Sequence, residues 1–527
     1  MSSIEAPASE LERLSEFHNE PYADFSRPQV REHYEEALAR VRGRLGREYA
    51  CRIGSESKRA GKTFASLNPS NPSEIVARHQ EAGPELAAEA VTAAAGMFEC
   101  WRLSAAEKRA GILLRAAALL RQRKAEFAAW MALETGKTWP EGEADASEAI
   151  DFCEYYARLA LKLAGPQPVT QLPGEHDELR YLPLGVVTVI PPWNFPLAIM
   201  AGMTTAAWVA GNTVVLKPSS DAATIAAEFV ELLREAGLPD GVVNLVTGGG
   251  TVVGRALVED PRVAMIAFTG SKAAGLDIQQ RAAAPRPGQQ LVKRVILELG
   301  GKDAILVDEE ADFAAAVEGV AVSAFGYQGQ KCSACSRAIV HEKIYDRFCE
   351  ALVERAGKIR VGAAEDFSST MGPVINQRAQ QGILGYIEIG KKEGRLLYGG
   401  QRMGENGYFV EPTIVADVAP RARIAQEEIF GPVLSLIPCR SFEHGLGIAN
   451  DTEYGLTGAV YSRNREKIER AKREFHVGNL YINRKCTGAM VGAHPFGGFK
   501  MSGTDSKAGG PDYLLLFTQA KSVAERL

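Results

Sequence analysis

Cysteine and histidine are both scarce in this chain, which has eight of each among 527 residues. The histidines form no cluster, and the cysteines are scattered along the sequence. This pattern excludes a disulfide framework, which belongs to short, cysteine-dense secreted chains. We therefore expect reduced thiols and a cytoplasmic protein.

A marked excess of charge is also lacking. The formal net charge is −5, and residues of both signs are mixed throughout. A nucleic-acid-binding protein would carry a basic face, so we expect no nucleic-acid partner. The first ten residues have no basic stretch followed by an apolar run, and we expect no secretory signal there.

One long segment lacks charged residues altogether. Tyr181 to Leu216 contains neither a charged residue nor a histidine and is long enough to cross a bilayer. Four prolines and three glycines interrupt it, however, and a spanning helix would have to repair its backbone hydrogen bonds at each of them. We expect a buried strand, a loop, a buried helix and a second strand, with no membrane contact.

Strands that alternate with helices are the main pattern present. From about Gly185, apolar runs of strand length are separated by stretches of helical length, and a second series extends from Ala304 to about Tyr481. Glu85 to Leu163 has the composition of several consecutive helices. Such alternation predicts parallel sheets, so we expect an α/β fold with two lobes and a cleft between them. The predicted strands include Val186–Ile190, Thr213–Leu216, Val242–Val246, Met265–Phe268, Ala304–Val307 and Ala338–Val340.

Cys332 is the first candidate for chemistry. It follows a glycine, Gly329, and lies three residues before Cys335. From this segment alone, Cys332 is a nucleophile, a buried packing residue, or half of a redox pair or zinc site. A zinc site would need two further ligands at similar spacing, and Cys349 and Cys486 stand alone. We also hypothesise that oxidation joins Cys332 and Cys335 in a reversible disulfide.

Two more polar residues stand in unusual surroundings. Glu298 is closely followed by Gly300 and Gly301, which predicts an exposed carboxylate on a turn. Asn194 lies in an apolar, charge-free segment, where a buried amide either caps a turn or binds an oxygen. A thiolate that attacks a carbonyl carbon, an amide that stabilises the oxyanion and a carboxylate that activates water form one catalytic set.

A nucleotide site is indicated by a lysine and two glycine-containing turns. Lys217 follows a predicted strand, which is where nucleotides bind in α/β sheets. Gly248 begins a glycine run at a strand-to-helix junction, and residues 268–271 end another strand before a helix. Each feature alone is equally compatible with turn glycines or a solvated lysine.

Six motifs in order resemble the aldehyde dehydrogenase superfamily over about Thr63 to Leu527. The resemblance implies that Cys332 is the nucleophile and Glu298 the general base, and that Asn194 and the Cys332 backbone N–H form the oxyanion hole. The motifs are PWNFP (192–196), KPSS (217–220), FTGS (268–271), ELGGK (298–302), GQKC (329–332) and EEIFGP (427–432).

The same resemblance implies an NAD(P) site. It assigns Lys217 to the adenosine ribose, Ser271 to the pyrophosphate and Glu428 to the nicotinamide ribose, with Phe430 beside it. Many relatives carry a glutamate at the position of Ser220, and its charge would repel a 2′-phosphate. We therefore expect NAD to be used and NADP to be tolerated. The other residues expected at the cofactor are Trp193, Gly248, Phe268, Thr269 and Gly270.

Residues 330–337 and 478–513 resemble the branch of this family that oxidises L-glutamate γ-semialdehyde to L-glutamate in proline breakdown, in its single-function form. Its substrate carries an ammonium and a carboxylate group at one end and the aldehyde at the other. The residues implied at the substrate are Glu148 for the ammonium group, Ser333 and the backbone N–H groups of Gly488 and Ala489 for the carboxylate, and Phe195 and Phe496 around the aliphatic chain.

Other interpretations of these residues stay open. Glu148 also fits a solvated helix face, and Ser333 fits a hydroxyl bonded to the backbone. Another carboxylate-bearing semialdehyde is an alternative substrate. A non-catalytic homologue is a further alternative, although such a protein would be free to lose the chemistry-bearing residues that this sequence keeps.

The resemblance also implies the domain organisation and the partners. The expected fold has a Rossmann-like cofactor domain, a catalytic domain and a small β element for oligomerisation. We expect a homodimer or larger homo-oligomer and a functional pairing with a separate proline dehydrogenase. The expected boundaries are 1–50 for an N-terminal arm, 51–164 and 183–297 for the cofactor domain, 298–490 for the catalytic domain, and 165–182 and 505–527 for the oligomerisation element.

Overall fold

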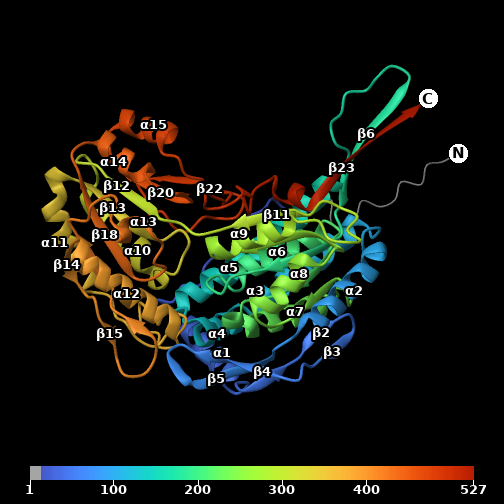
Figure 1. Ribbon diagram of the computed structural model, residues 1–527, viewed down its shortest axis with the longest axis horizontal. Helices are drawn as coiled ribbons and strands as arrows, with labels where there is room; N and C mark the ends of the chain where they lie inside the picture. The colour runs from blue at the N-terminus through green and yellow to red at the C-terminus, as the bar shows by residue number, and fades with distance from the viewer. Residues whose placement is uncertain (1–13) are drawn as a thin grey trace.

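The structure, a computed structural model, describes residues 14–527 (Figure 1). A seven-stranded sheet forms the core of one half of the molecule, in the strand order β11-β10-β7-β8-β9-β2-β3. Strands β7 to β11 are parallel, and β2 and β3 extend the β9 edge by antiparallel pairing. The bounds are β2 Cys51–Ile53, β3 Glu56–Lys58, β7 Val186–Ile190, β8 Thr213–Leu216, β9 Val243–Leu245, β10 Val263–Thr269 and β11 Arg294–Glu298.

Helices pack around this sheet and around one another over a core that includes the buried side chains of Trp101, Trp130 and Trp208. The first helix of the described residues begins at Pro28, because proline suits the first turn of a helix. The bounds are α1 Pro28–Arg42, α2 Pro84–Trp101, α3 Ala106–Gln122, α4 Lys124–Thr135, α5 Trp139–Ala164, α6 Ala198–Val209, α7 Ala223–Glu235, α8 Arg255–Glu259 and α9 Lys272–Ala283.

A second seven-stranded sheet, on the left of Figure 1, has the order β14-β17-β18-β13-β12-β20-β21 and is parallel except for β14. The two parallel sheets expected from the sequence are therefore confirmed. The strands are β12 Asp303–Val307, β13 Cys335–His341, β14 Arg395–Tyr398, β17 Thr413–Ala416, β18 Val433–Cys439, β20 Thr457–Tyr461 and β21 Asn479–Ile482. The helices are α10 Phe313–Phe325, α11 Tyr345–Ala356, α12 Gln377–Glu393, α13 Arg423–Gln426, α14 Phe442–Asn450 and α15 Arg465–Glu474.

A two-stranded ribbon projects from the body at the upper right of Figure 1. It pairs β6 (Glu175–Pro183) with β23 (Thr518–Arg526) in antiparallel register over their whole length. Within residues 165–182, which we expected to be part of the oligomerisation element, a strand begins only at Glu175, after a Pro- and Gln-containing stretch. The smaller strands are β1 Arg47–Tyr49, β4 Thr63–Asn68, β5 Asn71–Gln80, β15 Arg402–Met403, β16 Phe409–Val410, β19 Tyr454–Gly455 and β22 Phe499–Lys500.

The charge-free segment forms β7, a loop, α6 and β8, as expected. Both strands and the helix are buried, which explains why the segment carries no charge. Within residues 14–527, no helix is both long and apolar enough to cross a membrane.

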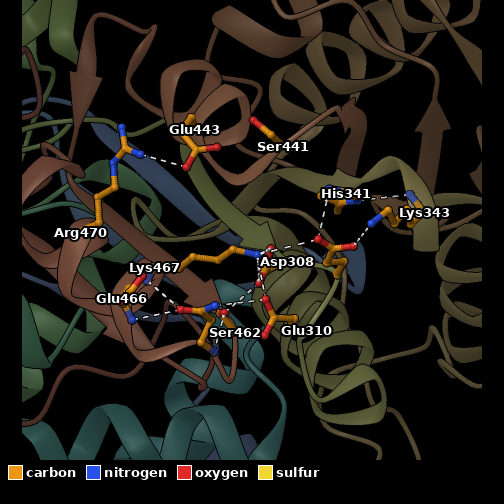
Figure 2. A network of polar contacts seen from close by, with 12 residues as sticks. Asp308, Glu310, His341, Lys343, Ser441, Glu443, Ser462, Glu466, Lys467 and Arg470 are labelled. Atoms are coloured by element: carbon orange, nitrogen blue, oxygen red, sulfur yellow. Dashed lines mark hydrogen bonds and ion pairs between the residues drawn. The ribbon is translucent and has the colours of Figure 1, made fainter.

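A polar network joins the carboxyl ends of two strands of the second sheet (Figure 2). Asp308, directly after β12, is buried and pairs with Lys467 of α15 at 2.8 Å. Ser462, directly after β20, donates a hydrogen bond to the same carboxylate at 2.8 Å. Because a buried carboxylate needs such partners, the network ties the carboxyl ends of two parallel strands together. Cys332 precedes β13 and therefore lies at the opposite side of this sheet, where the parallel strands begin.

The cysteines differ sharply in exposure. All eight lie within the described residues and are unpaired. Cys100 on α2 is exposed, Cys332 is half-buried and the other six are buried. The thiol of Cys335 donates to the backbone oxygen of Arg337 at 3.5 Å inside the core, where oxidants have little access.

Candidate active site

One pocket gathers residues that are far apart in the sequence. Both ionisable catalytic candidates, Cys332 and Glu298, line it, and so do all six residues expected at the substrate. The lining is completed by side chains from α5, α6, β10 and the C-terminal loops. The lining residues are Glu148, Phe152, Phe195, Ile199, Gly202, Met203, Thr269, Glu298, Cys332, Ser333, Gly488, Ala489, Phe496, Ala508 and Tyr513.

A left-handed turn presents Cys332 to this pocket. Tyr327, Gln328 and Gly329 have φ values of 50°, 55° and 66°, a conformation that is uncommon for residues with a side chain. The Tyr327 hydroxyl donates to the backbone oxygen of Thr135 at 3.0 Å, and the Gln328 amide donates to that of Pro373 at 2.6 Å. These buried hydrogen bonds hold the turn that precedes the nucleophile.

Gly300 and Gly301 allow two other segments to approach. A Cβ atom at Gly300 would overlap with the Glu428 carboxylate, and one at Gly301 would overlap with the backbone oxygen of Cys332. The backbone N–H of Gly301 also donates to Glu428 at 3.0 Å. Gly300 is therefore required by the approach of Glu428, and Gly301 by the approach of the loop that carries Cys332 (residues 329–334), called the catalytic loop below.

The Cys332 thiol lies in a negative environment. Burial first, and then the charges of Asp303, Glu298 and Glu428, raise the pKa of the thiol well above its usual range. The protein alone therefore favours the protonated thiol. The backbone N–H of Cys332 donates no hydrogen bond to another described residue, so it is available to a ligand.

Glu298 is the last residue of β11 and is half-buried, so the prediction of an exposed carboxylate on a turn was wrong. The glycines after it pack against the catalytic loop instead of opening into solvent. The buried hydroxyl of Ser506 donates to Oε1, whereas Oε2 has no hydrogen-bond partner among the described residues. Burial raises the pKa of Glu298 to about 8, although the hydrogen bonds from Ser506 partly offset this.

Asn194 is buried beside the catalytic loop. Its Nδ2 atom donates to the backbone oxygen of Gln330, two residues before Cys332, at 3.0 Å. An amide nitrogen carries two N–H bonds, so one remains for a second acceptor. The side chain thus bonds to the catalytic loop and keeps a donor beside it.

Glu148 lines the pocket from α5 and is half-buried, so it does not lie on an open helix face. The capping box of Thr138 and Glu141 fixes the start of this helix. Glu148 accepts no hydrogen bond from the described residues. Burial and then the charge of Asp145 raise its pKa to about 8. A cation is the partner that this carboxylate lacks.

Donors without partners lie across the pocket from α5. Ser333 is buried, and its hydroxyl has no partner among the described residues. The backbone N–H groups of Gly488 and Ala489 likewise donate to none of these residues. Arg484 donates to the backbone oxygen of Gly488 at 3.0 Å and holds the loop in its turn. Such a group of donors suits a carboxylate.

Aromatic side chains form a further part of the pocket wall. Phe195 and Phe496 both line the pocket. The ammonium group of Lys137 lies 4.1 Å from the Phe195 ring centroid and 3.3 Å from the carboxylate of Asp145. This buried ion pair supports the Phe195 ring from behind, a role that no local sequence pattern indicated.

A second cavity lies between α8 and α9 and is lined by apolar side chains, among them Val258, Phe268 and Ile278. Lys217, directly after β8, packs its aliphatic chain near Gly254 at the edge of this cavity. Its buried ammonium group donates to the backbone oxygen of Pro218 at 2.8 Å, and burial lowers its pKa to about 8.

The other residues expected at the cofactor lie at or shortly after the carboxyl ends of β8, β9 and β10. Thr269 ends β10 and lines the first pocket, and Ser271 caps the N-terminus of α9 through its hydroxyl. Ser220 is exposed, Gly248 has a φ of 142°, and Gly270 packs against the Phe268 ring.

Glu428 and Phe430 approach the catalytic loop from the second sheet. The Phe430 ring makes an edge contact with Trp193, with a centroid distance of 5.6 Å. Phe268 and Lys217 thus lie at the α8–α9 cavity, whereas Glu428 lies next to Gly300 and Gly301.

Comparisons with known proteins show the family to which this chain belongs. The family model described as the aldehyde dehydrogenase family matches residues 56–523. The chain belongs to the aldehyde dehydrogenase family. Within this family, a 1-pyrroline-5-carboxylate dehydrogenase of Geobacillus sp. (strain WCH70) is 54% identical over 509 residues, which cover 97% of this chain and 99% of that protein.

Solved structures of the family give the same picture. The 1-pyrroline-5-carboxylate dehydrogenase from Thermus with bound NAD matches with a TM-score of 0.96 and 51% identity, over 98% of this chain and 100% of that one. Proline utilization A (PutA) from Bdellovibrio bacteriovorus has a TM-score of 0.96 and 46% identity, over 99% of this chain and 54% of that one. The predicted aldehyde dehydrogenase fold is confirmed.

Proposed function

We propose that this aldehyde dehydrogenase oxidises L-glutamate γ-semialdehyde to L-glutamate and uses NAD as the oxidant. One observation carries the proposal. A single pocket is lined by a thiol and a carboxylate, which we assign to its near end, and by an unpaired carboxylate and a group of free donors, which we assign to its far end. The relatives from Geobacillus and Thermus described above are named 1-pyrroline-5-carboxylate dehydrogenase.

The far end of the pocket fits an α-amino acid. Glu148 lacks a cation, and the substrate ammonium group supplies one. Ser333 and the backbone N–H groups of Gly488 and Ala489 receive the carboxylate. Charge-assisted hydrogen bonds at both groups orient the molecule, and Phe195 contacts its aliphatic chain.

At the near end, the Cys332 thiol loses its proton to solvent, and the resulting thiolate adds to the aldehyde carbon and forms a thiohemiacetal. The carbonyl oxygen becomes negative and accepts hydrogen bonds from the free N–H of Asn194 and the backbone N–H of Cys332. NAD, when bound, supplies the acceptor for the hydride that the tetrahedral carbon then loses. The product on Cys332 is a thioester.

Hydrolysis of the thioester needs a base. The ionised Glu298 carboxylate takes a proton from a water molecule, which attacks the acyl carbon as the Cys332 sulfur leaves. Because the pKa of Glu298 is raised to about 8, this carboxylate accepts protons more readily than an ordinary glutamate. L-Glutamate is released and the thiolate is restored.

The described residues fit a dinucleotide. The buried ammonium group of Lys217 has one protein acceptor and keeps donors for ribose hydroxyls. The apolar cavity next to it, between α8 and α9, fits a planar base. Glu428 lies beside the catalytic loop, where it would accept from the hydroxyls of the second ribose.

The test follows the reduction of NAD by absorbance with three aldehydes. These are pyrroline-5-carboxylate, which opens to the semialdehyde in water, succinic semialdehyde and propanal. We expect kcat/KM for the amino-acid aldehyde to exceed that for propanal by about 100-fold or more, because two ionic contacts contribute. Equal or better turnover of propanal would refute the substrate assignment while leaving the Cys332 chemistry in place.

We also propose how the chain is organised and where it works. The ribbon of β6 and β23 is long, exposed and open at its edges, which favours pairing with another copy in a homodimer or larger assembly. The domain boundaries given from the sequence remain our proposal. Unpaired cysteines suit the cytoplasm, and a separate proline dehydrogenase would supply the substrate.

A further inference from the structure

Residues 14–27, called the arm below, pack against two of the elements that line the pocket. The Phe17 ring packs edge-on against Tyr155 of α5, with a centroid distance of 5.1 Å. The Tyr22 hydroxyl lies 3.5 Å from the sulfur of Met490. The arm therefore contacts both the helix that carries Glu148 and the loop that follows Ala489.

Asn19 joins these two elements through one atom. Its Nδ2 donates to Oδ2 of Asp151 at 2.8 Å and to the backbone oxygen of Val491 at 3.0 Å. Asp151 lies about one helical turn after Glu148, and Val491 lies two residues after Ala489. A single amide group thus connects α5, which carries Glu148, to the loop that carries Gly488 and Ala489.

Asp151 depends on the arm for its hydrogen bonds. It is buried, and the backbone N–H of Glu20 donates to its second oxygen at 2.6 Å. No described cation lies within ion-pair distance of it. Burial raises the pKa of Asp151 to about 6, although the bonds from Asn19 and Glu20 lower it in part. At neutral pH the group is a carboxylate, which accepts strong hydrogen bonds.

The substrate makes the spacing of these elements important. In an α-amino acid the ammonium group and the carboxylate share one carbon, so the distance between them is fixed. Glu148 and the loop at Gly488 and Ala489 must match that distance. A displacement of about 1 Å between binding groups is enough to reduce the rate of an enzyme about 100-fold.

We propose that Asn19 is a positioning residue that sets the spacing between Glu148 and the Gly488–Ala489 loop and thereby gives the enzyme its preference for α-amino-acid aldehydes. This inference rests on the proposed function. Simple aldehydes use only the near end of the pocket, so their turnover is independent of the arm.

A separate connection keeps the fold intact when Asn19 is changed. The Tyr156 hydroxyl of α5 accepts from the backbone N–H of Gly509 at 2.9 Å, and the Gly509 oxygen accepts from Gly492 at 2.9 Å. This path ties the inner side of the loop to α5. Loss of the outer contact therefore loosens the spacing without releasing the loop.

The experiment compares Asn19→Ala and Asn19→Asp with the unchanged full-length enzyme. Asn19→Asp keeps the size of the side chain but replaces the donor with a second carboxylate next to Asp151. Ser26→Ala is the matched control, because the Ser26 hydroxyl bonds to Asp24 within the arm at 2.6 Å and reaches neither α5 nor the Gly488–Ala489 loop. Each protein is assayed with pyrroline-5-carboxylate and with propanal, and its Tm is recorded.

We expect KM for pyrroline-5-carboxylate to rise about tenfold in Asn19→Ala, as for one lost charge-assisted hydrogen bond, and further in Asn19→Asp. Kinetic constants for propanal should stay within about twofold, and Ser26→Ala should match the unchanged enzyme. A parallel loss with both substrates, or no change with either, overturns the inference. Failure of the proposed function is distinct, because the unchanged enzyme would then show no preference for pyrroline-5-carboxylate.

Discussion

At the near end of the pocket the reactive groups lie at strand ends, whereas at the far end they lie on a helix and a loop. Glu298 ends β11 and is fixed by the main-chain hydrogen bonds of its sheet, and Cys332 lies three residues before β13, after a turn that buried hydrogen bonds of Tyr327 and Gln328 hold. Glu148 and the Gly488–Ala489 loop are related instead through side-chain hydrogen bonds, among them those of Asn19. The difference indicates that the chemistry is rigidly built and that selectivity rests on fewer, separable contacts.

The largest effect should come from the nucleophile. Cys332→Ser should lower the turnover of pyrroline-5-carboxylate and propanal alike by about 1,000-fold or more, because a hydroxyl is a far weaker nucleophile than a thiolate. Steady-state kinetics with both substrates, together with the Tm, tests this. Retention of activity with either aldehyde would show that the near end does not serve both substrates.

A selective effect is expected at the far end. Glu148→Gln keeps the shape of the side chain but removes its charge, so kcat/KM for pyrroline-5-carboxylate should fall about 100-fold. Propanal lacks an ammonium group, and its constants should change by less than about threefold. An equal fall with both aldehydes would mean that the two ends are not separable.

The pH dependence of propanal turnover should distinguish Glu298, the proposed base, from Glu148, which is proposed to bind the substrate ammonium group. With propanal, Glu148 takes no part, and turnover limited by hydrolysis should fall about tenfold per pH unit below about pH 8, because Glu298 must be ionised to act. A rapid first turnover that persists at lower pH would locate the loss in hydrolysis.

The hydroxyl of Ser506 provides the control for that pH profile. Its hydrogen bonds lower the pKa of Glu298, so Ser506→Ala should move the profile to higher pH. A profile that does not shift, or that shifts to lower pH, would show that the fall in turnover at low pH comes from another group.

The smallest effect should lie outside both ends. Ser220→Glu adds a charge near the expected ribose, which should reduce turnover with NADP about tenfold and leave that with NAD unchanged. Initial rates with the two nucleotides at saturating aldehyde provide the measurement. No detectable NADP turnover in the unchanged enzyme would refute the idea that Ser220 permits the 2′-phosphate.

Local patterns predicted what local chemistry determines. Apolar runs marked the strands, since burial selects side chains along short segments, and the motif around Cys332 indicated the nucleophile. The contacts of Ser506 with Glu298 and of Asn19 with Asp151 join residues 208 and 132 positions apart, and no local pattern encodes them. The prediction of an exposed Glu298 was wrong for the same reason, because segments that are distant in the sequence form its environment.

The exposure of the cysteines makes the enzyme suited to active-site counting by chemical labelling. A thiol-alkylating reagent meets only two accessible targets among the described residues, Cys100 on the surface and Cys332 in the pocket. With Cys100 replaced by serine, each equivalent of reagent consumed would report one intact pocket. The moles of reagent consumed per mole of protein then give the fraction of intact pockets in any preparation, whatever the turnover rate of the molecules.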